Sequence, residues 1–260
     1  MAIHLKTKED IETLKEAGRR HSEILRIVSE AVVPGIKTSD LDKIAKDKIE
    51  EYGDEASFLN YTPDGISYPY PSSLCVSIND EVVHGIPGSR TLKDGDVASL
   101  DLGLTHKGMI VDAAVTVAVG EVSDTSKDLI SVTKMALEAG IEACVPGNTV
   151  GDIGHAIEEY IKNRGSQYGI IRILSGHGVG YEVHEDPYVP NYGKKGKGER
   201  LVPGMVIAIE PMVTLGTDEV YQTDDEYTYI TADDSLSAHF EHTVAITEEG
   251  PIVLTKRDWN

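Results

Sequence analysis

Cysteine, aromatic side chains and long apolar runs are all scarce in this sequence of 260 residues. Neither the N-terminal stretch MAIHLKTKED nor any later segment has the roughly 18 consecutive apolar residues of a membrane span, and no signal peptide is expected. We therefore expect a cytoplasmic protein with no membrane contact. Cys75 and Cys144 are expected to be isolated buried thiols, because cytosolic proteins seldom keep disulfides.

Positive charge is also in short supply. The chain has 24 basic and 44 acidic side chains, which gives a formal net charge of -20 at pH 7. Such a surface repels phosphate backbones, so DNA binding is not expected. The run GKKGKGER (193–200) is the only basic cluster. It predicts a solvated loop, with transient docking to ribosomal RNA as the alternative. Apolar residues are abundant at 40%, enough for the core of a soluble globular protein.

Helix and strand patterns alternate along the chain in a repeated plan. Apolar residues recur at helical spacing in four segments, which form two pairs, and each pair is followed by strand-like runs. Thr7 and Asp10 resemble a capping box, while Gly53 and Gly165 end the second and fourth segments. The expected helices span 8–31, about 41–53 (starting after Thr38-Ser39-Asp40 and stopping at Gly53), 124–143 and 150–164, and the expected strands lie near 73–79, 96–104, 109–119, 171–174, 205–213, 219–230 and 239–247.

Two stretches of sequence repeat. VPGIKTSDLDKIAKDKIEEYG (33–53) aligns without a gap with VPGNTVGDIGHAIEEYIKNRG (145–165), and LKDGDVASLD (92–101) aligns with LVPGMVIAIE (201–210). Loop-to-helix boundaries often look alike, because proline, glycine and aspartate mark such boundaries in general. An internal duplication explains the gapless match better.

The duplication predicts where carboxylates meet. The second alignment places Asp101 over Glu210. We expect one catalytic domain of residues 1–260, built from pseudo-symmetric halves of about 5–122 and 123–255. Equivalent strands, and with them equivalent carboxylates, would then surround one axis.

The segment SLDLGLTHKGMIVDAAVT (99–116) places two aspartates in a buried hairpin. Strand side chains alternate between faces, so Asp101 points away from the apolar face of its strand. A four-residue loop at 105–108 would set Asp101 directly opposite Asp112. Facing carboxylates repel one another unless they share a proton or bind a cation. One or two metal ions would remove this conflict.

Further residues have the chemistry of metal ligands. Glu210 in GMVIAIEPMV and Glu241 in HFEHTVAIT occupy strand positions where valine or isoleucine is expected. His177 lies between two glycines, where the backbone can approach closely, and His184 follows seven residues later. Each acid taken alone is compatible with a solvent-exposed strand end. Together these residues predict a metal site.

These motifs resemble the type I methionine aminopeptidases in order and spacing, over about residues 5 to 255. The resemblance implies the α/β (α+β) pita-bread fold, in which helix pairs duplicated about a pseudo-two-fold axis cover a curved, mostly antiparallel sheet. It also implies a monomeric enzyme that removes the N-terminal methionine from nascent proteins and peptides and prefers a small second residue. The motifs that carry it are VVHGIP (82–87), Asp101 with Asp112, GHGVGYEVHEDP (176–187), IEPMV (209–213) and FEHT (240–243).

The same resemblance implies a site with two divalent ions, bridged by Asp112 and Glu241, whose identity as Co, Mn, Fe or Zn the sequence does not determine. A water or hydroxide between the ions would attack the first peptide bond. Glu210 would move the proton toward the leaving amine, His184 would donate to the oxyanion, and His84 would contact the scissile amide. The implied metal ligands are Asp101, Asp112, His177, Glu210 and Glu241; the implied catalytic residues are His84, His184 and Glu210; the implied substrate-binding residues are His84, His184, Tyr70, Cys75 and Tyr227.

Several positions depart from the family pattern. Ile110 and Val111 stand where a His-Gly pair is common, Val183 stands where an aromatic residue is common, and Leu174 stands where an aromatic residue or methionine is preferred. The loop TPDGISYPY leaves open whether one pocket tyrosine is displaced to Tyr68 or replaced by Ser67. None of these positions is an implied ligand, so they concern the shape of the side-chain pocket rather than the reaction.

Two alternatives stay open at this point. The first is a proline-specific aminopeptidase or prolidase of the same fold, although such enzymes usually carry an additional N-terminal domain for which this chain has no room. The second is a non-catalytic pita-bread binding protein, although such proteins lose metal ligands and all five ligand positions are filled here.

Overall fold

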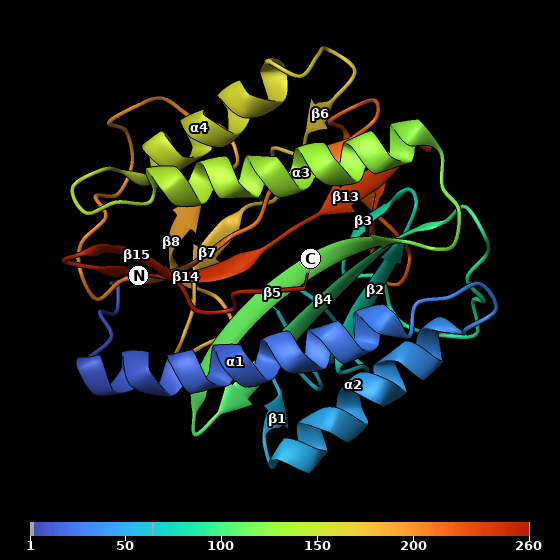
Figure 1. Cartoon of the computed structure of the whole chain (residues 1–260), viewed down its shortest axis with the longest axis horizontal. Helices are drawn as coiled ribbons and strands as arrows, with labels where there is room; N and C mark the ends of the chain where they lie inside the picture. The colour runs from blue at the N-terminus through green and yellow to red at the C-terminus, as the bar shows by residue number, and fades with distance from the viewer. Residues whose placement is uncertain (1–2, 64, 260) are drawn as a thin grey trace.

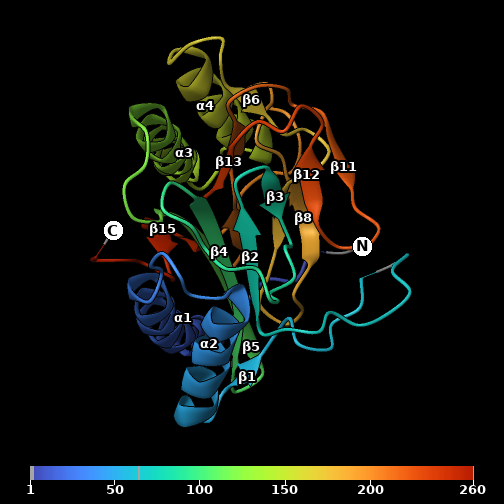
Figure 2. The same ribbon diagram turned by 90° about the vertical axis from the view of Figure 1, so that its right-hand side faces the viewer.

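The computed structural model describes residues 3–63 and 65–259, and in this part of the chain four helices lie in two pairs. Figure 2 shows all of them on one side of the strands, with one pair in each half of the molecule. Thr7 and Asp10 form the predicted capping box: each backbone N–H donates to the other's side chain. The helices are α1 (Lys8–Glu30), α2 (Thr38–Tyr52), α3 (Asp124–Ala143) and α4 (Val150–Lys162), close to the predicted bounds.

The strands form several sheets between and behind the helix pairs (Figure 1). One sheet contains β1 (Glu55–Ala56), β2 (Leu74–Ile78), β4 (Val97–His106) and β5 (Met109–Ala118). A second contains β7 (Gly176–Gly178), β8 (Glu185–Val189), β9 (Val206–Ile209), β14 (His242–Thr247) and β15 (Gly250–Val253). The shorter strands are β3 (Glu81–Val83), β6 (Gly169–Ile170), β10 (Met212–Thr214), β11 (Val220–Gln222), β12 (Tyr229–Thr231) and β13 (Ser237–His239). Every pairing between these strands is antiparallel.

Several predicted strands are wrong in extent. No strand covers 171–174; β6 and β7 lie on either side of it. The strand expected over 205–213 stops at Ile209 and resumes at Met212, because Pro211 has no N–H to donate to a neighbouring strand. The strand expected over 219–230 is likewise divided by a turn, and the one over 239–247 divides between β13 and β14. Two of these breaks leave Glu210 and Glu241 outside the regular hydrogen-bonded pairing of the strands.

The predicted register of the β4–β5 hairpin is also wrong. The turn contains two residues, Lys107 and Gly108, both with positive φ (50° and 78°), as a tight hairpin turn requires. Asp101 therefore pairs with Ala114 instead of Asp112. The error is two residues, so the side-chain alternation is preserved. Both aspartates still point to the same face, as diagonal neighbours.

The internal repeat is visible in the backbone. Lys37, just before α2, forms an isolated antiparallel bridge with Thr91, and Thr149, just before α4, forms the same bridge with Arg200. Lys37 and Thr149 are matched in the first sequence alignment, and Thr91 and Arg200 each lie one residue before the start of the second. The duplicated helix pairs are thus attached to their sheets in the same way.

The apolar core runs through both halves, with contributions from α1, α3, β4, β5, β9 and β14. Cys75 and Cys144 are buried and unpaired, as predicted. Among the described helices, none has the length and apolar composition needed to span a bilayer.

Candidate metal centre and active site

A cavity of about 420 Å³ opens beside β4, β5 and β7 and beside the end of β9. Every residue that the sequence predicts for the site contributes to its wall. These residues are Tyr70, Cys75, His84, Asp101, Asp112, His177, His184, Glu210, Tyr227 and Glu241.

The candidate ligands come from both halves of the chain. Asp101 and Asp112 lie within β4 and β5, and His177 lies within β7. Glu210 follows the last residue of β9, and Glu241 lies between β13 and β14. Regular strands thus hold the two aspartates, whereas the two glutamates occupy the strand breaks.

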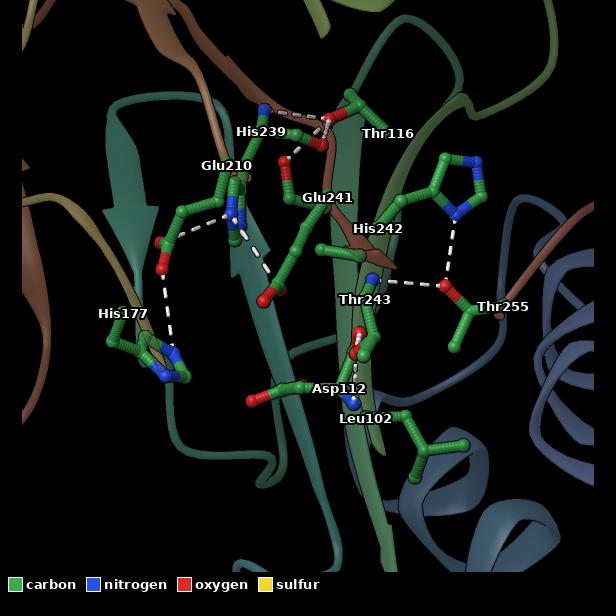
Figure 3. A network of polar contacts seen from close by, with 12 residues as sticks. Leu102, Asp112, Thr116, His177, Glu210, His239, Glu241, His242, Thr243 and Thr255 are labelled. Carbon is green, nitrogen blue, oxygen red and sulfur yellow. Dashed lines mark hydrogen bonds and ion pairs between the residues drawn. The ribbon is translucent and has the colours of Figure 1, made fainter. Parts of the chain in front are cut away.

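The side chains of Asp112, His177, Glu210 and Glu241 converge on one space (Figure 3). Ligand atoms of Asp112, His177 and Glu241 lie within 4.8 Å of one another. The Nε2 atom of His177 is 3.5 Å from Oε1 of Glu210. Asp101 lies on the same face of the hairpin as Asp112 and is also buried, with 8% of its surface exposed against 4% for Asp112.

Burial makes ionisation of these acids costly. It raises the pKa of Asp101 to about 6, and it raises the pKa of Asp112 well above the ordinary value, an effect that the charge of Asp101 increases. Burial likewise raises the pKa values of Glu210 and Glu241 well above their ordinary range. The charge of Arg257 lowers the pKa of Glu241, but burial and the neighbouring acids outweigh it, so the cluster is costly to ionise without a further cation.

The residues fit a divalent metal. Oδ1 of Asp101, Oδ1 of Asp112 and Oε1 of Glu241 are buried without a hydrogen-bond partner, although buried polar atoms are normally paired. Burial lowers the pKa of His177 to about 3, so its imidazole is neutral near pH 7 and able to ligate a metal. Four carboxylates and one imidazole form a donor set suited to hard or borderline divalent ions.

The two other predicted histidines, His184 and His84, lie at the edge of this cluster. The ring of His184 contacts that of His177 edge-on, with centroids 4.5 Å apart. His84 has a φ of 60°, in the left-handed region that a non-glycine residue adopts only at a cost. Burial lowers the pKa of His84 to about 4 and also lowers that of His184, so both rings are neutral near pH 7.

The other side of the cavity is apolar. A small cluster of buried residues lines it, separate from the main core. Tyr70, which donates its hydroxyl proton to Gly85 O, belongs to it, whereas Tyr68 does not line the cavity. Ile110 packs against this cluster, while Val111 points to the main core. The cluster consists of Phe58, Tyr70, Cys75, Val183 and Tyr227.

Sequence reasoning missed three residues near the site. His239 is 2% exposed, and its Nε2 atom lies 3.6 Å from Glu210 Oε2 and 4.0 Å from Glu241 Oε2. Its position two residues before Glu241 was a usable signal, because strand residues two apart share a face. Phe58 and Tyr61 come from the loop before Tyr70, where no periodic pattern marks them.

Comparison with known proteins supports this picture. A methionine aminopeptidase of Clostridium acetobutylicum is 46% identical over 97% of this chain and 98% of that protein. The crystal structure of a methionine aminopeptidase from Thermotoga maritima superposes with a TM-score of 0.93 at 40% identity, covering 98% of this chain and 100% of that one.

A prolidase from Pyrococcus furiosus superposes with a TM-score of 0.76 at 24% identity, which shows a shared fold alone. This chain is covered to 98%, but only 66% of the prolidase chain is matched. These likenesses confirm the pita-bread fold that the sequence predicts. The model of Metallopeptidase family M24 matches residues 12–248, so the chain belongs to this family of metal-dependent hydrolases.

Proposed function

We propose that the chain is an aminopeptidase that removes the initiator methionine from nascent proteins and peptides and prefers a small second residue. The observation that carries this proposal is the cavity, which has buried carboxylates with unpaired oxygens on one side and an apolar cluster on the other. The relatives that match over nearly the full chain are named methionine aminopeptidases.

The metal would be held by Asp101, Asp112, His177, Glu210 and Glu241. We propose that these five residues would hold two divalent ions, because carboxylates from both halves reach the same space. When bound, divalent ions in such a site lower the pKa of water to about 7 and polarise a carbonyl.

The remaining chemistry belongs to the protein's own side chains. Glu210 would accept a proton from the attacking water and pass it to the leaving amine; its carboxylate lies 3.5 Å from His177 Nε2, which supports this role. Neutral His184 would donate a hydrogen bond to the developing oxyanion. His84, which also lines the cavity, would contact the scissile amide.

The apolar cluster suits a methionine side chain. Tyr70, Cys75 and Tyr227 are each 5% exposed or less, so a thioether placed among them would be removed from water. Burial raises the pKa of the Cys75 thiol well above its ordinary value, so this cysteine offers an apolar surface rather than a nucleophile.

Three finer points belong to the same proposal. We expect a cytoplasmic monomer, as nothing in the function requires a second copy. The backbone of the run 193–200 packs against the start of α4. The carbonyl oxygens of Lys194 and Lys197 lie beside Gly151, and Lys197 O accepts a hydrogen bond from Gly151 N. The charge of this run makes it the candidate for transient ribosome contact on an otherwise acidic protein.

Hydrolysis of Met-Ala-Ser tests the proposal. Metal-free protein is reloaded with Mn, Co, Fe or Zn, and free methionine is measured beside release of alanine from Ala-Pro-Ser. We expect methionine release with at least one metal, and its loss in Asp112→Asn. The control Asp47→Asn, which removes a carboxylate from the exposed face of α2, should keep full activity. Cleavage of Ala-Pro-Ser alone would favour the proline-specific alternative, and cleavage of neither peptide by folded, metal-loaded protein would favour a binding role.

A further inference from the structure

Tyr61 makes a direct contact with His184 at the edge of the cavity. Its hydroxyl oxygen lies 2.8 Å from Nδ1 of the imidazole, and the two ring centroids are 5.4 Å apart. Both residues line the cavity, but they come from segments more than a hundred residues apart in the chain. The contact therefore joins the loop before Tyr70 to the loop that follows β7.

The backbone beside His184 is fixed independently of Tyr61. The buried carboxylate of Glu185 accepts hydrogen bonds from Lys6 Nζ at 2.6 Å and from the backbone N–H groups of Tyr181 and Glu182 at 2.6 and 3.1 Å. Lys6 and Glu185 side chains are only 1% and 3% exposed. Because the main chain is held in this way, the orientation and tautomer of the His184 ring depend on what its nitrogens contact.

Tyr61 is itself held in place. Its carbonyl oxygen accepts a hydrogen bond from Tyr70 N at 2.8 Å and a longer one from Tyr227 Oη at 3.4 Å. Its N–H donates to Phe58 O at 2.9 Å. The phenol thus projects from a backbone that is tied to the apolar cluster, which gives it a defined position toward His184.

The chemistry of the contact decides which nitrogen carries the proton. A phenol O–H is a stronger donor than a neutral imidazole N–H, and an unprotonated imidazole nitrogen is a stronger acceptor than a phenol oxygen. Donation from Tyr61 to Nδ1 requires the imidazole proton to be on Nε2. We propose that Tyr61 is a positioning residue that holds His184 in this tautomer, so that Nε2–H on the other side of the ring is free to donate to the oxyanion.

The proposal relies on the proposed function for the role of His184, but the position of the proton is measurable without any substrate. Two-bond ¹H–¹⁵N correlation spectra of the metal-free protein at about pH 8 distinguish the two tautomers, and His184→Gln assigns the resonances. We expect wild-type His184 to carry its proton on Nε2. A proton on Nδ1 in the wild-type spectrum would overturn the proposal.

The variant Tyr61→Phe removes the hydroxyl alone. In its spectrum the two nitrogen shifts of His184 should move toward one another, as the tautomers mix. The matched control is Tyr68→Phe, because the Tyr68 hydroxyl donates to Asp225 O and Tyr68 is not among the residues that line the cavity. The control should leave both shifts unchanged. Identical His184 shifts in wild type and Tyr61→Phe would also overturn the proposal.

Kinetics test the consequence for the reaction. Loss of one neutral hydrogen bond that orients a donor in the transition state should lower kcat by about five- to tenfold. KM should change by less than about twofold, because the contact does not touch the bound side chain. An unchanged kcat in Tyr61→Phe would refute the catalytic consequence. If wild-type protein releases no methionine at all, the proposed function fails, while the spectra still decide the tautomer.

Discussion

Replacing Asp101 by asparagine should stabilise the metal-free protein at alkaline pH. Burial raises the pKa of Asp101 from 3.8 to about 6, so ionisation is less favourable in the folded chain than in the unfolded chain. The contribution of Asp101 to the free energy of unfolding is therefore fully present below about pH 4 and is lost as the pH rises through 6. A difference of about 2 pKa units corresponds to a loss of about 3 kcal/mol. Asparagine is close in shape and carries no charge, so it avoids this loss.

Urea unfolding in the presence of a chelator measures the effect. We expect the free energy of unfolding of Asp101→Asn to exceed that of wild type by about 2 to 3 kcal/mol at about pH 8, and by less than about 1 kcal/mol at about pH 4. Asp47→Asn, on an exposed helix face, should change it by less than about 0.5 kcal/mol at either pH.

Metal should reverse the order of stability. An ion that binds only the folded state stabilises it by an amount that grows with its concentration relative to Kd. Wild type should therefore gain more from added Mn than Asp101→Asn, which has lost a candidate ligand. The reasoning is refuted if metal-free Asp101→Asn is less stable than wild type at about pH 8.

Three further predictions follow from other contacts. Lys6→Met leaves the buried Glu185 carboxylate without its cation and should lower the free energy of unfolding by about 3 kcal/mol at neutral pH; a loss under about 1 kcal/mol in urea titrations would contradict this. Gly103→Ala would place a Cβ 2.6 Å from the Phe58 ring and push it into the apolar side of the cavity, so KM for Met-Ala-Ser should rise several-fold, whereas an unchanged KM would show that the ring moves elsewhere. Burial lowers the pKa of His21 from 6.5 to about 4, so its contribution to stability is complete above pH 6.5 and is lost as the pH falls toward 4. His21→Gln should therefore unfold with a shallower pH dependence in that window, and an unchanged slope would exclude His21 as its source.

The helices were predictable because their signals are local. The capping box at Thr7 and the left-handed Gly53 lie within one turn of the elements they bound, and the structure places both as expected. The strands between 171 and 247 were less predictable. Their interruptions depend on residues such as Pro211 and on which neighbour each strand meets, and neither follows from alternation of side chains alone.

The candidate site was predictable in content but not in detail. Acidic residues inside apolar strand patterns revealed Asp101, Asp112, Glu210 and Glu241, because an unpaired buried charge is otherwise too costly to keep. The hairpin register failed by two residues because the turn was shorter than assumed. Tyr61 was missed because its contact with His184 forms only when two distant loops meet.

Two carboxylates of the site occupy matched positions in the aligned segments but differ in their backbone setting. Asp101 and Glu210 match in the aligned halves, and both reach the same cavity. Asp101 continues within β4 and is held by pairing on both sides, with Cys75 on β2 and Ala114 on β5. Glu210 instead precedes Pro211 at a strand end, where the side-chain amide of Asn191 binds its carbonyl oxygen at 2.9 Å.

This difference fits the separate roles that we propose for Asp101 and Glu210. A carboxylate inside a continuous strand has little freedom, which suits a residue that only holds an ion. A carboxylate at a strand end, 3.5 Å from His177 and 3.6 Å from His239, can be oriented by neighbouring imidazoles and has room to accept and release a proton. Removal of charge at the two positions should therefore differ: Asp101→Asn should act mainly on metal affinity, whereas Glu210→Gln should lower kcat even at saturating metal. Equal losses of kcat in both variants, measured on metal-saturated protein, would contradict this division.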